Sequence, residues 1–210
     1  GAGILAYTQD ENLQKFFSSH QNQTTDHLST YFFEPLGNGA VTSLIIGGFY
    51  LGGRLSDNKR LSGTSLIAAK SFITASIGTQ IIKHLTHRPR PYQDAIADDN
   101  VWEGPFEGFD FTSFPSGHSA AAFSVATVFA FEYRETVWVP ILAYTLAGGT
   151  AISRLYDNKH WASDVLIGSA LGFVTGRFMW KQSKKKNSRF SILPAAGFRQ
   201  GSMSIFIRLS

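Results

Sequence analysis

The chain has 210 residues, no cysteine and a formal net charge of +4. That length suits one domain with a sizeable core, so residues 1–210 are treated as a single domain. Without cysteine there are no disulfides, thiolate metal sites or cysteine nucleophiles. Part of the positive charge gathers in residues 181–189, which is typical of a solvated helix end, and no pattern of a nucleic-acid-binding fold surrounds it.

Helical patterns dominate the chain. Residues 8–34 carry scattered aromatic and leucine side chains, which predict amphipathic surface helices. A turn is expected at 35–39 and a charged connection at 54–62. Five apolar segments predict core helices at residues 40–53, 63–85, 117–133, 137–152 and 163–180. The second of these must end before Pro89 and Pro91.

Two segments outside the helices have a different character. Residues 92–114 form a long loop rich in carboxylates and aromatic side chains, which we interpret as a lid over a site or as local core. The spacing of its carboxylates does not match a calcium-binding loop, and no metal site is assigned. Residues 189–210 alternate like strands and predict a small C-terminal β-hairpin. The expected fold class is all-α, an up-down helical bundle with amphipathic N-terminal helices and this hairpin.

Alternating helix directions bring four helix ends together. The helices at 63–85 and 137–152 end there, and those at 117–133 and 163–180 begin there. The polar side chains near these four ends should therefore converge at one end of the bundle. They are Lys83, Arg88 or Arg90, Ser116, His118, Arg154, His160 and Asp164.

The chemistry of this end suits an oxyanion. Lysine and arginine supply positive charge, and a guanidinium can bind two oxygens of a tetrahedral anion at once. Ser116 and Gly117 open a helix, so free backbone N–H groups point at the site, Gly117 allows close approach and Ser116 adds a hydroxyl. These features favour phosphoryl transfer, which needs electrostatic holding of the phosphoryl group.

The two histidines at this end have different tasks available. His160 precedes Asp164 by one helical turn, so the carboxylate can accept one ring N–H and leave the other nitrogen free to attack. His118 has no acid close in sequence and suits a general acid that protonates the leaving oxygen. Asp157 and Lys159 are interpreted as residues at the rim of the site.

The spacing of these residues resembles a family signature in three parts. The parts are Lys83 with Arg90-Pro91, then Pro115-Ser116-Gly117-His118, then Ser153-Arg154 with His160 and Asp164. They resemble the type 2 phosphatidic acid phosphatase superfamily, to which vanadium-dependent haloperoxidases and bacterial non-specific acid phosphatases are related. The resemblance covers residues 83–164 without departure at a signature position. Its spacing selects Arg90 rather than Arg88 as the phosphate ligand.

The resemblance implies a role for each matched residue. His160 would attack phosphorus and form a phosphohistidine while Asp164 holds its ring, and His118 would protonate the leaving alkoxide and then activate water. The phosphoryl oxygens would be bound by Lys83, Arg90, Ser116, Gly117 and Arg154. The resemblance also implies that hydrolysis needs no metal or other cofactor, and that vanadate or phosphate can occupy the site.

The uninterrupted apolar segments are shorter than the roughly 20 residues of a membrane span, and Lys70 interrupts the second helix. We therefore expect a soluble or peripheral protein, with a membrane surface as a compatible partner. The family resemblance implies a location in the bacterial periplasm. The start at Gly1 without methionine agrees with a removed targeting segment. The alternative is an inner-membrane protein with a periplasmic active site, because basic residues gather at the end opposite the site.

The expected function is a metal-independent phosphomonoesterase, or phosphatase, that acts on a lipid phosphate or a small phosphate ester. Three alternatives are open: a vanadate-dependent haloperoxidase, an integral-membrane lipid pyrophosphate phosphatase, and a non-catalytic anion sensor. No nucleic acid partner is expected, and no feature of the sequence indicates an oligomeric state.

Overall fold

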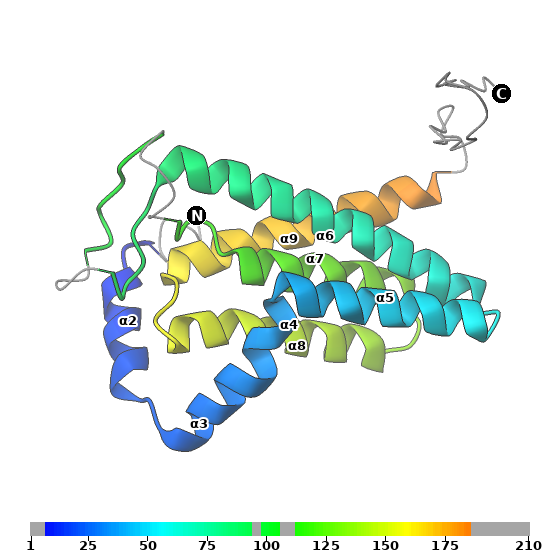
Figure 1. The fold of residues 1–210 in the computed structure, drawn as a ribbon, viewed down its shortest axis with the longest axis horizontal. Coiled ribbons are helices and arrows are strands. Elements are labelled where there is room, and N and C mark those ends of the chain that lie inside the picture. The colour runs from blue at the N-terminus through cyan, green and yellow to red at the C-terminus, as the bar shows by residue number, and fades with distance from the viewer. Residues whose placement is uncertain (1–6, 94–97, 106–111, 186–210) are drawn as a thin grey trace, which may run out of the picture.

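The computed structural model of the chain describes residues 7–93, 98–105 and 112–185, and its regular elements are helices. The N-terminal elements are α2 (Asp10–Ser19), α3 (Gln23–Leu28), the π-helical turn η1 (Ser29–Phe33) and α4 (Glu34–Gly37). The long helices are α5 (Gly39–Leu55), α6 (Lys59–Thr86), α7 (Gly117–Glu132), α8 (Trp138–Tyr156) and α9 (Ala162–Lys184). The long helices run along the longest axis of the molecule, and α2 and α3 cover one end (Figure 1).

The predicted helical bundle is confirmed for the described residues, with shifted boundaries. Helix α6 begins at Lys59 rather than 63, because the Asn58 side chain accepts the Leu61 N–H and caps the first turn. Helix α8 continues to Tyr156, so the polar residues expected after its end lie in its last turns. The β-hairpin expected at 189–210 lies outside the described residues.

The prediction of a turn at 35–39 is wrong for residues 35–37, which belong to helix α4. Pro35 lies in the first turn of α4, where its missing N–H removes no helical hydrogen bond. Asn38 then separates α4 from α5 and caps α5, because its side chain accepts the Ala40 N–H at 2.9 Å. A glycine-rich and proline-containing stretch therefore forms two helix ends instead of a loop.

Helix α7 lies at the centre and packs against α6, α8 and α9. Its buried side chains are mostly Ala, Ser and Thr, which keeps the neighbouring helices close. A Cβ atom at Gly168 of α9 would lie 2.4 Å from the Ser116 carbonyl oxygen, and one at Gly172 would lie 2.4 Å from that of Ala120. Only glycine permits this approach, which brings the first turns of α7 and α9 together.

Large apolar side chains cover the outside of the bundle. On α6, Ile73, Ile77, Ile81 and Leu85 follow one another at four-residue spacing and are 53% to 57% exposed. Trp138 on α8 is 77% exposed. This distribution is the reverse of the usual amphipathic helix, whose large apolar side chains face the core. Among the residues that the structure describes, one helix, α6, has the length and composition needed to cross a membrane.

Candidate active site

One end of the bundle holds the predicted site residues. Helices α6 and α8 end there, and α7 and α9 begin there (Figure 1). Lys83, in the last turns of α6, donates to the carbonyl oxygens of Thr112 and Ser113. The Ser113 hydroxyl donates to Asp164 and lies 3.4 Å from Nδ1 of His160. Ser113 therefore joins the lysine, the carboxylate and the histidine into one cluster.

His160 lies in the short connection between α8 and α9. Its backbone N–H donates to the Arg154 carbonyl oxygen at 3.2 Å, so the connection stays wound onto the end of α8. Nδ1 faces Oδ2 of Asp164 at 3.7 Å, which leaves Nε2 as the nitrogen free to attack. Burial lowers the pKa of His160 to about 3, against the opposing effect of the Asp164 carboxylate. The imidazole is therefore neutral, and able to act as a nucleophile, near neutral pH.

Asp164 is fully buried, and its carboxylate is held by several donors. Oδ1 accepts from Nη1 of Arg88 at 2.6 Å, and Oδ2 accepts the Trp161 N–H at 3.0 Å together with the Ser113 hydroxyl. These donors compensate the cost of burying the charge and fix the carboxylate in place. A fixed carboxylate can orient the ring of His160 and stabilise positive charge on it.

Arg88 supports Asp164 from behind the site. Sequence spacing had set it aside in favour of Arg90, and no role was predicted for it. Its side chain is fully buried and surrounded by three aromatic rings. The guanidinium carbon lies 4.8 to 5.3 Å from the ring centroids of Tyr7, Trp102 and Trp161. Its terminal nitrogens donate at 2.6 to 2.9 Å to Asp10 Oδ2, Asp99 O, Ser163 Oγ and Asp164 Oδ1. The guanidinium thus positions the carboxylate and does not lie open to substrate.

Arg154 is held by acidic residues on two sides. Nη1 lies 3.2 Å from the Glu34 carboxylate of α4, and Nη2 donates to Asp157 at 2.7 Å. Asp157 also accepts from the Ser29 hydroxyl at 2.7 Å. Asp157, interpreted from the sequence as a residue at the rim, thus orients a predicted phosphate ligand and connects it to η1.

The remaining predicted residues lie around the start of α7. Lys83 and Arg90 are close enough for their charges to act on both His118 and His160. A Cβ atom at Gly117 would lie 3.9 Å from Cε of Lys83, so the turn that opens α7 faces the lysine. The charges of Lys83 and Arg90 therefore act on both histidines of the site.

Ser116 caps α7 as well as lying at the site. Its Oγ accepts from the Ser119 hydroxyl at 2.9 Å and from the Ser119 N–H at 3.4 Å. Both contacts use the oxygen as an acceptor, so the Ser116 hydroxyl hydrogen is not spent on the cap. Behind His118 lies Gly37 of α4, where a Cβ atom would come within 2.7 Å of the His118 Cβ atom. The N-terminal helices thus form the back wall of the site.

Sequence reasoning missed the residues that support the site from a distance in the chain. Ser113 contacts Asp164 across 51 positions, and Asp10 contacts Ser163 across 153. Motif spacing carries no signal for such contacts, because they depend on how separate elements pack. In the expected lid, the described residues Asp99 and Trp102 contact Arg88, so this part forms a wall of the site; its role as a lid stays a prediction.

Family and sequence comparisons agree with the spacing of the site residues. The family model described as PAP2 superfamily matches residues 64–188. Lipid A 1-phosphatase of Porphyromonas gingivalis is 48% identical over 71 residues, which are 33% of this chain and 16% of that protein. Probable diacylglycerol pyrophosphate phosphatase 1 of Schizosaccharomyces pombe is 23% identical over 210 residues, covering 85% of this chain and 73% of that protein.

Two solved structures share the fold. A transmembrane PAP2 type phosphatidylglycerolphosphate phosphatase from Bacillus subtilis has a TM-score of 0.68 and 23% identity, covering 86% of this chain and 87% of that one. LpxE of Aquifex aeolicus has a TM-score of 0.60 and 20% identity, covering 82% of this chain and 94% of that one. At these identities the likeness is one of fold.

Proposed function

The chain belongs to the PAP2 superfamily, and on this premise we propose that it is a phosphatase that hydrolyses a lipid phosphate through a phosphohistidine at His160. The observation that carries the proposal is the buried His160–Asp164 pair, whose Nδ1 faces the carboxylate while Lys83 and Arg90 act on the same ring. The names of the lipid A and diacylglycerol pyrophosphate relatives support a lipid as substrate.

The proposed reaction has two steps. Burial and the charge of Arg154 lower the pKa of His118 to about 4 in the free protein, and binding of the phosphate anion beside it raises that pKa so that the ring is protonated in the complex. In the first step, Nε2 of His160 forms a bond to phosphorus, the bond to the leaving oxygen breaks, and protonated His118 gives its proton to that oxygen. In the second, His118 takes a proton from water, the water oxygen attacks phosphorus, and the P–N bond breaks to release phosphate. Asp164 stabilises the positive charge on the His160 ring in both steps.

Holding the phosphoryl group is the other half of the proposed mechanism. Lys83, Arg90 and Arg154 supply the charge that balances the phosphoryl oxygens, and the backbone N–H groups at the start of α7 add donors. Because Glu34 and Asp157 hold Arg154 in place, its guanidinium needs little reorganisation when the substrate binds. The residues of the chain thus cover the charge requirements of phosphoryl transfer without a metal ion, and metal independence is part of the proposal.

An apolar cavity beneath the site favours a lipid over a small polar ester. Its volume is about 500 Å³, and it lies between α5, α7 and α8. At one end it is lined by Leu36 and Thr150, and Thr150 contacts Gly37, which packs against His118. At the other end it is lined by Tyr133, near the far end of α7. A lipid whose phosphate occupies the site could extend an acyl chain into this cavity.

The outer surface supports the integral-membrane alternative over the soluble protein that the sequence favoured. Exposed isoleucine and leucine side chains along α6 would face lipid, and small residues would fill the interior. Lys70 is exposed on α6, and its long side chain could extend toward the nearer membrane surface. Because the basic residues of 54–60 and 177–185 lie at the end opposite the site, we propose that the active site faces the periplasm.

The test pairs membrane fractionation with turnover. We expect the full chain to remain in the membrane after a high-salt wash, to be released by detergent, and to liberate phosphate from phosphatidic acid or a lipid A phosphate. His160→Asn should lose at least about 1000-fold in kcat, because the nucleophile is removed. Labelled lipid phosphate should leave an acid-labile label on the wild-type protein and none on the variant.

Exposed His27 provides the matched control, because His27→Asn changes a histidine of α3 that takes no part in the proposed reaction. That variant should keep wild-type turnover. Substantial turnover by folded His160→Asn would contradict the assignment of the nucleophile. Turnover of soluble esters alone, by protein that a salt wash releases, would contradict the lipid substrate and the membrane location.

A further inference from the structure

Glu34 places a carboxylate next to a proposed phosphate ligand. It is the first residue of α4, and its carboxylate lies 3.2 Å from Nη1 of Arg154. The Thr150 hydroxyl donates to the carbonyl oxygen of the neighbouring Phe33 at 3.1 Å, which fixes the start of α4 against α8. A carboxylate at this position repels the phosphoryl oxygens that Arg154 is proposed to bind. Its presence in the site therefore calls for a task that offsets this repulsion.

Fixing Arg154 does not account for Glu34. Asp157 already accepts from Nη2 of Arg154 at 2.7 Å, and the Ser29 hydroxyl holds Asp157 at 2.7 Å. The side chain of Asp157 is 13% exposed, whereas that of Glu34 is 37% exposed. The more exposed ion pair is the weaker of the two, because water screens it. The orientation of Arg154 therefore depends mainly on Asp157.

The short helix α4 that carries Glu34 also packs against His118. A Cβ atom at Gly37 would come within 2.7 Å of the His118 Cβ atom. Glu34 lies three residues before Gly37, so the two positions share one face of the helix. Helix α4 packs against both α7 and α8, which carry His118 and Arg154. One helical turn thus joins Glu34 to the proposed general acid as well as to the proposed phosphate ligand.

The cations around His118 oppose its protonation. Burial and the charge of Arg154 lower the pKa of the ring, and Arg90 and Lys83 lower it further. The Glu34 carboxylate has the opposite effect and raises that pKa. Glu34 therefore favours the protonated ring, the form that a general acid needs before it can act.

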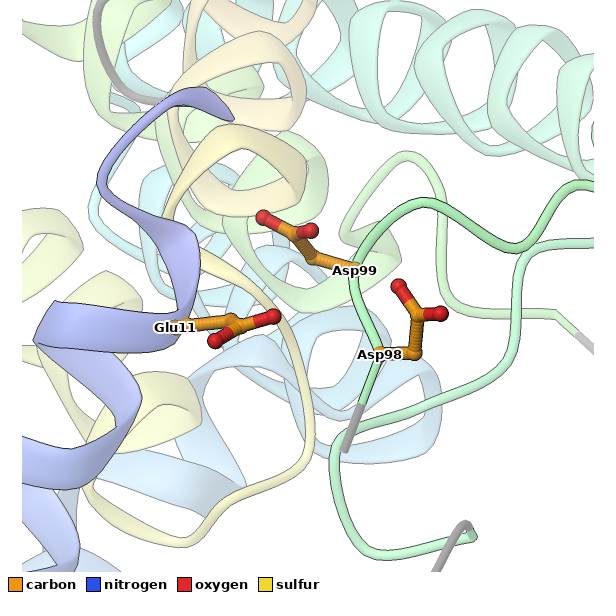
Figure 2. Close-up of side chains that lie close together, drawn as sticks. All are labelled: Glu11, Asp98 and Asp99. Carbon is orange, nitrogen blue, oxygen red and sulfur yellow. The ribbon is translucent and has the colours of Figure 1, made fainter. Parts of the chain in front are cut away.

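Other acids at this end of the molecule lie elsewhere. Glu11 extends from the first turn of α2 toward the loop that carries Asp98 and Asp99 (Figure 2). The charges of Glu11 and Asp98 act on Asp99. None of the three is among the charges that act most strongly on His118, which include Glu34. The position of Glu34 on α4 is what brings a carboxylate to this ring.

We propose that Glu34 is a positioning residue that keeps the proton on His118 until the leaving oxygen takes it. The inference rests on the proposed phosphatase reaction and adds to it a residue outside the spacing motif of residues 83–164. Glu34 itself exchanges no proton: the proton passes from His118 to the leaving oxygen as the bond from phosphorus to that oxygen breaks. When His118 then takes a proton from water, the same carboxylate stabilises the imidazolium that forms.

The test compares two leaving groups, with the full chain in detergent. Diacylglycerol leaves phosphatidic acid as an unstable alkoxide unless it is protonated, whereas p-nitrophenolate is a stable anion that leaves p-nitrophenyl phosphate without a proton. Glu34→Gln removes the charge and keeps the shape. At saturating substrate, single-turnover release of diacylglycerol should slow at least about tenfold, and release of p-nitrophenol should slow less than about twofold.

The pH dependence of the same single-turnover rate gives a second readout. A general acid must be protonated, so the rate of diacylglycerol release falls as pH rises through the pKa of His118 in the complex. Without the Glu34 carboxylate this fall should occur at lower pH, by about half a unit or more. Glu34→Asp keeps the charge and should restore part of the rate and part of the shift.

Asp157→Asn provides the matched control, because it removes the other carboxylate that contacts Arg154. It should slow release of both leaving groups alike and leave the pH of the fall unchanged. Asp98→Asn, at an exposed position, should behave as the wild type does. Equal slowing of both leaving groups by Glu34→Gln, with no shift in pH, would overturn the proposal and leave Glu34 as a partner of Arg154 alone. If the wild-type chain hydrolysed neither substrate, the proposed function would fall and this inference with it.

Discussion

Arg88 and Arg90 are two positions apart and have opposite surroundings. Arg88 is fully buried and bound to two carboxylates, whereas Arg90 is partly exposed and its charge acts on both histidines of the site. Pro89 lies between them, and its carbonyl oxygen accepts from the Trp161 indole at 3.0 Å. The residue type cannot tell which arginine is buried and which faces the site. The difference arises because α2 and α9 pack around Arg88.

The Arg88 assignment predicts a specific kinetic effect. Arg88→Lys keeps the charge but offers a compact ammonium group, which cannot span the four acceptors that the planar guanidinium reaches. We expect kcat to fall at least about tenfold with little change in KM, because Arg88 positions Asp164 and does not bind substrate. Steady-state kinetics on a folded variant measure both constants.

Arg134 at the opposite end of the bundle offers the comparison. Arg134→Lys, at an exposed position, should leave both constants unchanged. A rise in KM with kcat preserved in Arg88→Lys would instead place Arg88 on the phosphate.

At the scale of elements, the contact between α7 and α9 brings Asp164, which faces the proposed nucleophile His160, close to the proposed phosphate ligands at the start of α7. The Ser116 N–H donates to the Asp164 carbonyl oxygen at 3.0 Å, so the first turns of the two helices are directly bonded. Gly168 and Gly172 make this distance possible, since a side chain at either position would meet backbone of α7. The N-terminal elements add the second contact, because Glu34 and Gly37 of α4 meet Arg154 and His118.

The tight contact predicts an asymmetry between two glycines. A Cβ atom at Gly172 would lie 2.4 Å from the Ala120 carbonyl oxygen, whereas one at Gly148 of α8 has nothing within 4 Å. Gly172→Ala should destabilise the protein by about 1–3 kcal/mol through overpacking. Gly148→Ala should be neutral or stabilise it by up to about 1 kcal/mol, because alanine is the better helix former.

Thermal unfolding in detergent compares the two glycine variants under the same conditions. Turnover should fall in Gly172→Ala as well, because separating α9 from α7 displaces Asp164. Equal midpoints of thermal unfolding for Gly172→Ala and Gly148→Ala would contradict the prediction, because they would mean that α9 can move away from α7 without loss of stability.

At the scale of the whole molecule, the charged segments, the exposed apolar side chains and the cavity are arranged along the long axis of the bundle. The site lies at one end, the basic segments lie at the other, and exposed apolar side chains cover the helices between them. The cavity between α5, α7 and α8 runs along the same direction, from Thr150 near the site to Tyr133. This arrangement suits a lipid that enters with its headgroup at the site and its chain among the helices.

The cavity predicts a substrate-dependent effect of narrowing it. Leu142 of α8 lines the cavity and is 60% exposed, so Leu142→Trp should narrow it without disturbing the core. We expect KM for long-chain phosphatidic acid to rise about tenfold, because each excluded methylene weakens binding, while KM for p-nitrophenyl phosphate stays unchanged. The measurement is phosphate release from each substrate in the same detergent.

Ile141 is the neighbouring position, 51% exposed and outside the cavity lining, and Ile141→Trp should affect neither substrate. An equal rise in KM for both substrates in Leu142→Trp would show that the cavity does not hold the acyl chain.

Local patterns of residues were enough to predict the existence and order of the core helices. They also predicted the end of the bundle at which Lys83, His118, Arg154 and His160 gather. Apolar segments and their Pro and Gly boundaries are local signals, and short connections force neighbouring helices to alternate in direction. The roles of these residues in catalysis remain predictions. The residues at which each helix begins and ends were harder to predict, since capping residues such as Asn58 act over only a few positions.

The support of the site depends on contacts between segments that are far apart in the chain. The bonds of Arg88 to Asp10 and Asp164 span 78 and 76 positions, and the bond of Ser29 to Asp157 spans 128. Which apolar side chains face outward was decided in the same way, because an apolar segment looks alike whether its neighbours are lipid or other helices. Contacts between distant segments depend on packing, and no local pattern of residues encodes them.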